Sequence, residues 1–362
     1  MKLSSRVSHG THPNKLSEIL AAKRRDGVRV WDLTESNPTR AGIVYPEGFL
    51  AALADPAVLR YEPEPFGLPA ARERIAEEYG VPFDNVVMTA STSEAYSWIF
   101  KLLCDPGDEV LVPQPSYPLF EYLAALESVR VRSYPLFYDH GWFIDFHALE
   151  KAVTPRTRAV VVVNPNNPTG HFIRRHELEE LEALRERHDL AILSDEVFAG
   201  YQLDVAEDSV TSLRGVADFA LDGLSKLAGL PQMKLAWMML RQPVPELEII
   251  ADTYLSAGTP VQTALGAMLE LREPVRRQIL DRARANLGIL DRYLRVEAGW
   301  YAVVPVMEEE ETSERLLQEH DVLVQPGYFY DFEKSGYLVL SLLTPPAVFA
   351  RGVAAIRAVQ GT

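Results

Sequence analysis

The sequence has little cysteine, a deficit of positive charge and no long hydrophobic run. Its 362 residues include one cysteine, Cys104, so no internal disulfide is possible and the composition fits a reducing compartment. Asp and Glu total 51 against 36 Lys and Arg, and this formal net charge of −15 disfavours nucleic acid and anionic membranes as partners. The segment Met1–Gly10 has no apolar signal-like stretch. We therefore expect a cytoplasmic protein that binds neither nucleic acid nor membrane.

Candidate metal ligands are also scarce. His171 and His176 lie near the start of a helical pattern, and we interpret both as surface residues instead of ligands, so no metal site is predicted. Cys104 ends a helical pattern after two leucines and is interpreted as a core residue, not a nucleophile. The acidic run Glu308–Glu311 is expected to be an exposed loop.

Short apolar runs alternate with amphipathic helical patterns through the middle of the chain. The runs at 86–88 and 190–193, for example, are nearly continuous in apolar residues, as strands buried on both faces are. This alternation of strand and helix patterns predicts an α/β fold with a mostly parallel sheet covered by helices. Later, a helical pattern at 273–295 precedes further strands and a last helix, which predicts a smaller α+β domain. We predict a large domain of residues 46–243 and a small domain formed by 1–45 and 244–362.

Polar residues recur where the predicted strands end. Because ligands of such sheets bind beyond the carboxyl ends of the strands, these residues are expected to share one site. Lys226 stands there after an apolar run, and Lys234 precedes the next such run; partial burial would lower the pKa of a lysine and suit Schiff-base chemistry. On that segment alone, two solvated loop lysines are the alternative. The residues that fall at strand ends are Ser91 to Ser93, Tyr117, Asn164 to Gly170, Asp195 and Lys226.

Four motifs in this order resemble the fold-type-I pyridoxal-phosphate-dependent aminotransferases of class I/II. They are the stretch 164–170 (NPNNPTG), 194–196 (SDE), 225–226 (SK) and Lys234. The resemblance extends from Thr34–Thr39 to the last helix. It implies a PLP-dependent transferase-like fold, pyridoxal 5'-phosphate (PLP) as the cofactor, an amino acid and a 2-oxo acid as substrates, and a homodimer.

The resemblance also implies roles for individual residues. Lys226 would form the Schiff base with PLP and move the substrate proton, and Asp195 would keep the pyridine nitrogen protonated. Asn167 would contact the phenolic oxygen, and Tyr117 would stack on the ring. Tyr61 would reach the phosphate of the neighbouring subunit's PLP. The phosphate would be held within the subunit by Ser91, Thr92, Ser93, Ser225 and Lys234, and candidate substrate contacts are Asn37, Arg40 and Tyr328.

Four positions depart from the commonest pattern of that family. Phe198 stands where a tyrosine is usual, Gly223 where a phosphate-binding serine is common, and Lys234 where arginine is usual. Val339 occupies the position of the arginine that clamps the substrate α-carboxylate. We hypothesise that Arg40 partly replaces that arginine, since a carboxylate buried without a cation is costly.

The sequence therefore predicts a PLP-dependent aminotransferase that acts on a small, apolar or aromatic amino acid. A PLP-dependent lyase, decarboxylase or racemase is the alternative, because the same cofactor serves several reactions and the surroundings of the substrate carbon choose between them. A PLP-binding protein without activity is disfavoured by the presence of Lys226, Asp195 and Asn167 together.

Overall fold

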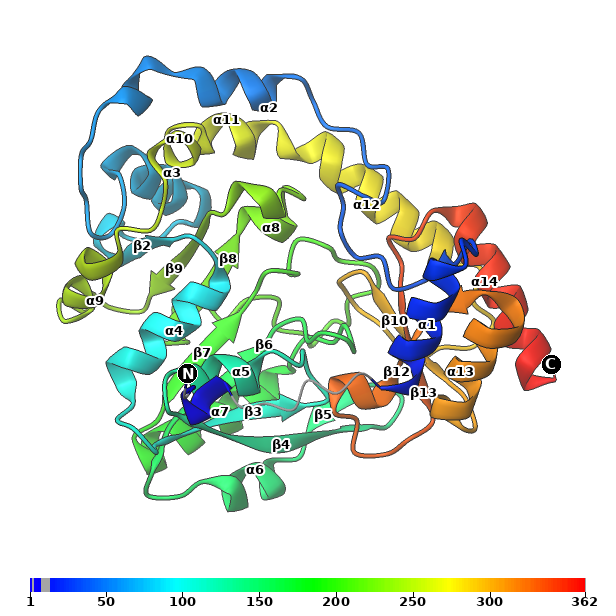
Figure 1. Cartoon of the computed structure of the whole chain (residues 1–362). Coiled ribbons are helices and arrows are strands. Elements are labelled where there is room, and N and C mark those ends of the chain that lie inside the picture. Colours follow the sequence, from blue (N-terminus) through cyan, green and yellow to red (C-terminus); the bar gives the residue numbers. More distant parts are fainter. Residues whose placement is uncertain (2, 8–13, 362) are drawn as a thin grey trace.

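The chain is described by a computed structural model that covers residues 1, 3–7 and 14–361 (Figure 1). An eight-stranded sheet has the order β2-β9-β8-β7-β6-β3-β4-β5. Its five central strands, from β8 to β4, run parallel, while β2, β9 and β5 run antiparallel to their neighbours. This confirms the predicted α/β fold. The strands are β2 (Val86–Thr89), β3 (Glu109–Gln114), β4 (Arg130–Tyr138), β5 (Trp142–Ile144), β6 (Thr157–Val163), β7 (Ala191–Asp195), β8 (Phe219–Gly223) and β9 (Ala236–Leu240).

Helices cover both faces of the large sheet. On one face, Ile99 of α4 packs in a cluster with Val110 of β3. On the other face, Leu181 of α7 shares a cluster with Ile192 of β7. Burial on both sides explains why these strands are almost continuously apolar. The helices around this sheet include α3 (Pro69–Tyr79), α4 (Thr92–Leu103), α5 (Phe120–Leu126), α6 (Phe146–Ala152), α7 (Arg175–His188), α8 (Leu224–Leu227), α9 (Leu247–Tyr254), α10 (Thr259–Thr263) and α11 (Leu265–Glu270).

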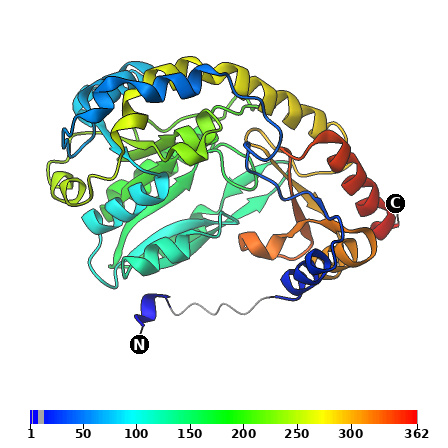
Figure 2. The ribbon, with the colours of Figure 1, turned by 45° about the horizontal axis from the view of Figure 1, so that its top comes forward.

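A smaller group of strands and helices lies beside the large sheet, on the right in Figure 1 and again in the turned view of Figure 2. An antiparallel sheet has the order β10-β13-β12, and β1 pairs in parallel with β11. Helix α1 contacts α13, so the N-terminal part of the chain packs with the C-terminal part. The division of the chain at residues 45/46 and 243/244 stays a prediction. The elements are α1 (Lys15–Arg25), β1 (Trp31–Asp32), β10 (Tyr301–Pro305), α13 (Glu309–His320), β11 (Val322–Leu323), β12 (Gln325–Pro326), β13 (Tyr337–Ser341) and α14 (Pro346–Gln360).

Three local predictions are wrong. The helix expected at 273–295 is α12 (Arg272–Leu287), which ends where Gly288 caps it. The acidic run begins α13, and Glu309 is buried because it accepts hydrogen bonds from the N–H groups of Tyr328 (3.1 Å) and Tyr337 (2.9 Å). His171 is buried beside Thr169, and burial lowers its pKa to about 3, so its ring is neutral.

Within the described ranges, no three residues of the types His, Cys, Asp and Glu are grouped so that they could hold a metal ion. The helices of those same ranges are all too short or too polar to cross a bilayer.

Candidate active site

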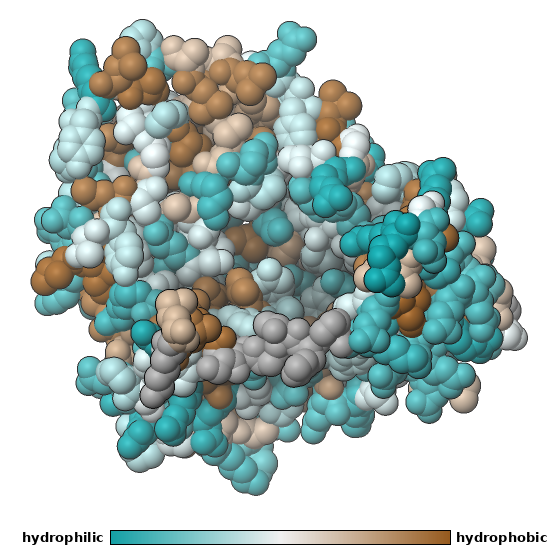
Figure 3. All heavy atoms as spheres, in the orientation of Figure 1, coloured by the Kyte–Doolittle hydropathy of each residue, from teal (hydrophilic) through white to brown (hydrophobic). Residues whose placement is uncertain are grey.

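A cavity of about 320 Å³ lies at the carboxyl ends of the central strands. The space-filling view shows this face of the molecule hollowed near its middle (Figure 3). The structure brings nine of the residues predicted from the sequence to this one cavity. They are Ser91, Thr92, Ser93, Tyr117, Asn167, Asp195, Ser225, Lys226 and Lys234, and the lining is completed by Ser36, Tyr96, Leu119, Phe120, Leu123, Val163, Val197, Phe198, Pro231 and Tyr301.

Lys226 enters the cavity from the short helix α8, directly after β8. Its ammonium nitrogen lies 5.4 Å from the centre of the Phe198 ring and 5.1 Å from that of Trp300. Burial lowers the pKa of Lys226 to about 8, although the attraction of Asp195 opposes the shift. The hydroxyl of Tyr201 donates a hydrogen bond to the backbone carbonyl of Lys226, which fixes the turn that carries the side chain. The arrangement provides an amine that loses its proton far more readily than a solvated lysine does, as a nucleophilic lysine requires.

Asp195 is the last residue of β7 and also lines the cavity. Burial raises the pKa of its carboxyl to about 6, while hydrogen bonds from the backbone N–H of Val197 (3.3 Å) and the hydroxyl of Tyr96 (3.1 Å) and the charge of Lys226 oppose the rise. A half-buried carboxylate in this position can stabilise a cationic ring nitrogen of a ligand. Sequence reasoning missed Tyr96, because an aromatic residue within an apolar helix pattern is ordinarily a core residue.

The N-terminus of α4 forms another wall. Ser91 is the helix cap: its hydroxyl oxygen accepts from the N–H of Glu94 (3.2 Å), and the Glu94 carboxylate accepts from the N–H of Ala90 (2.7 Å). The N–H groups of a helix's first turn have no acceptor within the helix, and they attract anions. Thr92 and Ser93 therefore provide an anion-binding wall, and Lys234 adds a positive charge to the lining of the same cavity.

Asn167 and Tyr117 come from two loops that are tied together. Asn167 is 8% exposed, and its buried Oδ1 has no hydrogen-bond partner within the part of the chain that the structure describes. The neighbouring Asn166 donates from Nδ2 to the carbonyl of Pro115 (3.0 Å), which fixes the loop that carries Tyr117. The Tyr117 ring stays about half exposed (47%) at the cavity, so it is open to stacking by a ligand.

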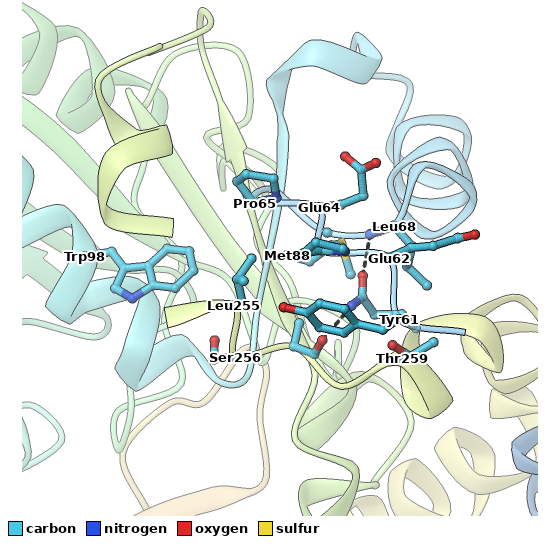
Figure 4. A pocket seen from close by; sticks show the side chains of 14 residues that line it. Tyr61, Glu62, Glu64, Pro65, Leu68, Met88, Trp98, Leu255, Ser256 and Thr259 are labelled. Atoms are coloured by element: carbon cyan, nitrogen blue, oxygen red, sulfur yellow. Dashed lines mark hydrogen bonds between the residues drawn. The ribbon is translucent and has the colours of Figure 1, made fainter. Parts of the chain in front are cut away.

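Four predicted residues lie outside the lining of this cavity. Tyr61 is 81% exposed and lines a separate pocket of about 60 Å³, where its ring lies near Ser256 and Thr259 (Figure 4). The Arg40 side chain is 75% exposed and pairs with Glu35 at 3.4 Å. The other two are Asn37, which accepts from the hydroxyl of Thr39 (2.8 Å), and Tyr328, which is 38% exposed.

The packing explains two of the departures from the family pattern. A Cβ at Gly223 would lie 2.8 Å from the Cβ of Ala236, so a serine does not fit without movement. Val339 is fully buried in β13 opposite Val303, and Tyr301, two residues from Val303, lies on the same face of the sheet. Tyr301 lines the cavity. An aromatic ring therefore occupies the side of the small sheet where an arginine would be expected.

Known structures identify the class of fold. The chain superimposes on an aminotransferase from Escherichia coli with a TM-score of 0.87 and 22% identity, covering 100% of this chain and 98% of the other. An alanine aminotransferase from Pyrococcus furiosus gives 0.85 and 22% identity, covering 100% of each. Both likenesses define the aminotransferase fold.

The sequence then identifies the family. The model of the family described as "Aminotransferase class I and II" matches residues 36–356. The glutamate-pyruvate aminotransferase AlaA of Escherichia coli K12 is 30% identical over 297 residues, covering 75% of this chain and 72% of that protein. The arginine–pyruvate transaminase AruH of Pseudomonas aeruginosa is 28% identical, covering 76% of each. The chain belongs to the aminotransferase class I and II family, and it is an enzyme that acts as a transaminase.

Proposed function

We propose that the enzyme is PLP-dependent and transfers the amino group of a small, apolar or aromatic amino acid to a 2-oxo acid, using Lys226 as its Schiff-base lysine. The observation that carries the proposal is the cavity, where the amine of Lys226, the carboxylate of Asp195 and the cap of α4 meet. This cavity provides a nucleophile, a partner for a cationic nitrogen and an anion-binding wall in one place.

The residues of the cavity fit PLP. The unpartnered Oδ1 of Asn167 shows a side-chain amide that still has hydrogen-bonding capacity inside the lining. Tyr117 offers a ring face to a planar pyridine. The phosphate would be held by the first turn of α4 together with Ser225 and Lys234. PLP bound here supplies an electron sink for the charge that remains on the substrate carbon after proton removal.

The chain's own residues then perform three tasks. Lys226 would hold the cofactor and, once its Nζ is free, would take the proton from the substrate carbon and deliver it to the cofactor carbon to which the lysine had been joined. Asp195 holds a proton on the ring nitrogen, since a nearby carboxylate favours the cation. Phe198 and Trp300 keep the surroundings of Nζ apolar, so the amine remains a usable base near neutral pH.

The apolar part of the lining, which includes Leu119, Phe120 and Leu123, supports an apolar or aromatic substrate, and Arg40 is the proposed partner of its carboxylate. Arg40 lies in the same N-terminal segment as Ser36, which lines the cavity, but it is now paired with Glu35. To bind the substrate, Arg40 must therefore give up its ion pair with Glu35 and form one with the substrate carboxylate. We expect Arg40→Ala to raise KM for amino acids and leave kcat nearly unchanged. An unchanged apparent affinity for every amino acid would rule out the role.

We also propose that two subunits form a homodimer in which Tyr61 contacts the phosphate in the neighbouring subunit's cavity. The Tyr61 ring is exposed outside its own subunit's cavity, and Leu50 and Leu59 of the same segment are 72% and 88% exposed. Large exposed apolar side chains close together are typical of an interface.

The direct test is absorbance of the purified enzyme after loading with PLP. We expect a band of lysine-bound cofactor in the wild type, its loss in Lys226→Ala, and its retention in the control Lys101→Ala, since Lys101 pairs with Glu127 outside the cavity. Adding amino acids one at a time should convert the band for the true donor, and a 2-oxo acid should restore it. Retention of the band in Lys226→Ala would refute the assignment, and ammonia release without a 2-oxo acid would indicate a lyase.

A further inference from the structure

Tyr96 lies inside α4, one helical turn beyond the residues that wall the proposed phosphate site. It is 3% exposed, and its ring packs edge-on against Phe120 with 5.3 Å between centres. That packing aims the hydroxyl at Asp195, where it donates to Oδ2 at 3.1 Å. Tyr96 and Ser93 are three residues apart and hence on one face of the helix. The same helix therefore serves both the anion-binding wall and the carboxylate.

The groups around Asp195 differ in whether they act on its carboxylate by charge or by a hydrogen bond. Lys226, from α8, attracts the carboxylate by charge, and the backbone N–H of Val197 donates to Oδ1. Burial above all, with the charge of Asp195 adding to it, raises the pKa of Tyr117 and of Asp222, but neither side chain donates a hydrogen bond to Asp195. Within the described chain, the Tyr96 hydroxyl is therefore the side-chain donor of a hydrogen bond to Asp195.

We propose that Tyr96 is a positioning residue whose hydroxyl keeps the Asp195 carboxylate ionised and oriented toward the ring nitrogen of the cofactor. The inference rests on the proposed PLP-dependent function. Its physical basis is that a hydrogen bond to a carboxylate stabilises the charged form against the cost of burial. The buried ring of Tyr96 has little freedom to turn away, so its hydroxyl already points at Asp195 before the cofactor binds.

The consequence is a specific pH dependence. Removing the hydroxyl by Tyr96→Phe takes away a contribution that lowers the pKa of Asp195, so its pKa must rise. A carboxyl with a higher pKa becomes protonated at a higher pH and then no longer stabilises the proton on the ring nitrogen. The acidic limb of the kcat profile should therefore move upward by about one pH unit, and the affinity for PLP should fall roughly tenfold at neutral pH.

A matched control exists on the neighbouring strand. Asp222 of β8 accepts a hydrogen bond from the Tyr79 hydroxyl at 2.7 Å, but neither residue lines the cavity. Tyr79→Phe thus removes the same chemical group from another buried Tyr–Asp pair. Its effect can only be to protonate Asp222 more readily, which withdraws negative charge from the neighbourhood of Asp195 and does not raise the pKa of Asp195. The acidic limb should not move upward in this variant.

The experiment measures kcat against pH, the absorbance of bound cofactor against pH, and the dissociation constant of PLP, for wild type, Tyr96→Phe, Tyr79→Phe, Asp195→Asn and the double variant Tyr96→Phe/Asp195→Asn. Because Tyr96 acts through Asp195, Tyr96→Phe should have no further effect on PLP affinity once Asp195 is Asn. Equal losses in both backgrounds, or an acidic limb superimposable on that of the wild type, would overturn the proposal.

The outcome also separates this inference from the proposed function. If the wild type binds no PLP, or Lys226→Ala keeps the lysine-bound band, the proposed function fails. If those tests succeed and the Tyr96 profile does not move, only the role of Tyr96 fails. Should Tyr96→Phe not fold, 3-fluorotyrosine at position 96 retains the ring and gives a more acidic hydroxyl. It should move the acidic limb to lower pH, and an unmoved limb would contradict the proposal.

Discussion

The ammonium nitrogen of Lys226 lies 5.4 Å from the centre of the Phe198 ring. The family resemblance leads one to expect a tyrosine hydroxyl at residue 198, and the chain instead offers an aromatic face without a polar group. Together with Trp300 this ring provides cation–π attraction to the protonated lysine but no hydrogen bond. Burial nevertheless outweighs this attraction and lowers the pKa of Lys226 to about 8.

The first prediction concerns the charge of this lysine. Burial lowers the pKa of Lys226 from 10.5 to about 8 in the folded protein, so the folded state binds fewer protons than the unfolded state between those values. The contribution of Lys226 to the free energy of unfolding therefore increases as pH rises through this window. In the cofactor-free enzyme, the rate of PLP uptake, measured by absorbance, should rise with pH and have its midpoint near pH 8.

Asp195→Asn provides the control for this pH dependence. The negative charge of Asp195 raises the pKa of Lys226, so the loss of that charge in the variant should move the midpoint of PLP uptake to a lower pH than in the wild type. A wild-type midpoint near pH 10 would mean that the lysine is solvated and that the apolar rings do not act as described.

The second prediction tests sharing of Tyr61 between subunits. Tyr61→Ala and Lys226→Ala should each be poorly active, but a mixed dimer contains one site with both native residues. After subunit exchange about half of the dimers are mixed, so roughly a quarter of the sites should regain activity, measured as transamination rate. Mixing Lys226→Ala with Asp195→Asn is the control: both residues line one subunit's cavity, so no native site forms. If the mixture of Tyr61→Ala and Lys226→Ala recovered no more activity than the control mixture, sharing of Tyr61 between subunits would be contradicted.

The third prediction concerns the glycine that replaces a serine. Gly223→Ser should lower the free energy of unfolding by about 1–3 kcal/mol, because its Cβ would lie 2.8 Å from Ala236 and 3.1 Å from the Leu235 carbonyl oxygen. Urea unfolding measures this loss. The control is Gly266→Ala in α11, where nothing lies within 4 Å and alanine should stabilise the helix by roughly 0.5–1 kcal/mol. An unchanged stability of Gly223→Ser would mean that β8 and β9 readily move apart.

The fourth prediction asks whether the missing arginine can be restored. Val339→Arg should lower the free energy of unfolding by more than about 3 kcal/mol, because the side chain is fully buried between β10 and β12 and a charge there has no partner. Val44→Arg is the control, since Val44 is 71% exposed and should change stability by less than about 0.5 kcal/mol. A folded Val339→Arg enzyme with a lower KM for amino acids would show that the cavity side of β13 is accessible after all.

Much of the site was predictable because its residues follow strands. Asn167, Asp195 and Lys226 come after buried apolar runs, and parallel strands bring such ends to one edge. Tyr96 and Tyr301 were not predictable in the same way. Each belongs to a pattern that is typical of a core residue, and only the three-dimensional packing shows that both line the cavity.

Glu309 and His171 were both predicted to be exposed, and the reasons for their burial are related. Glu309 belongs to a run of four acidic residues that the sequence alone does not distinguish, yet it is the one that accepts backbone hydrogen bonds from the segment 328–337. His171 is buried with the hydroxyl of Thr169, two residues before it, 2.8 Å from its Nδ1. In both cases a polar residue is buried by partners distant in sequence or by loop geometry, neither of which periodicity reports.

The pairing of β1 with β11 has a consequence for the order in which the enzyme matures during synthesis. Trp31 pairs with Val322, and the N–H and hydroxyl of Ser341 donate to the carbonyls of Leu33 and Glu35. The segment carrying Ser36 is synthesised before the large sheet, but the residues that anchor it are synthesised after that sheet. A nascent chain can therefore assemble the large sheet and its lysine early. The part of the cavity lining that Ser36 forms is fixed only once the strand carrying Ser341 has been made.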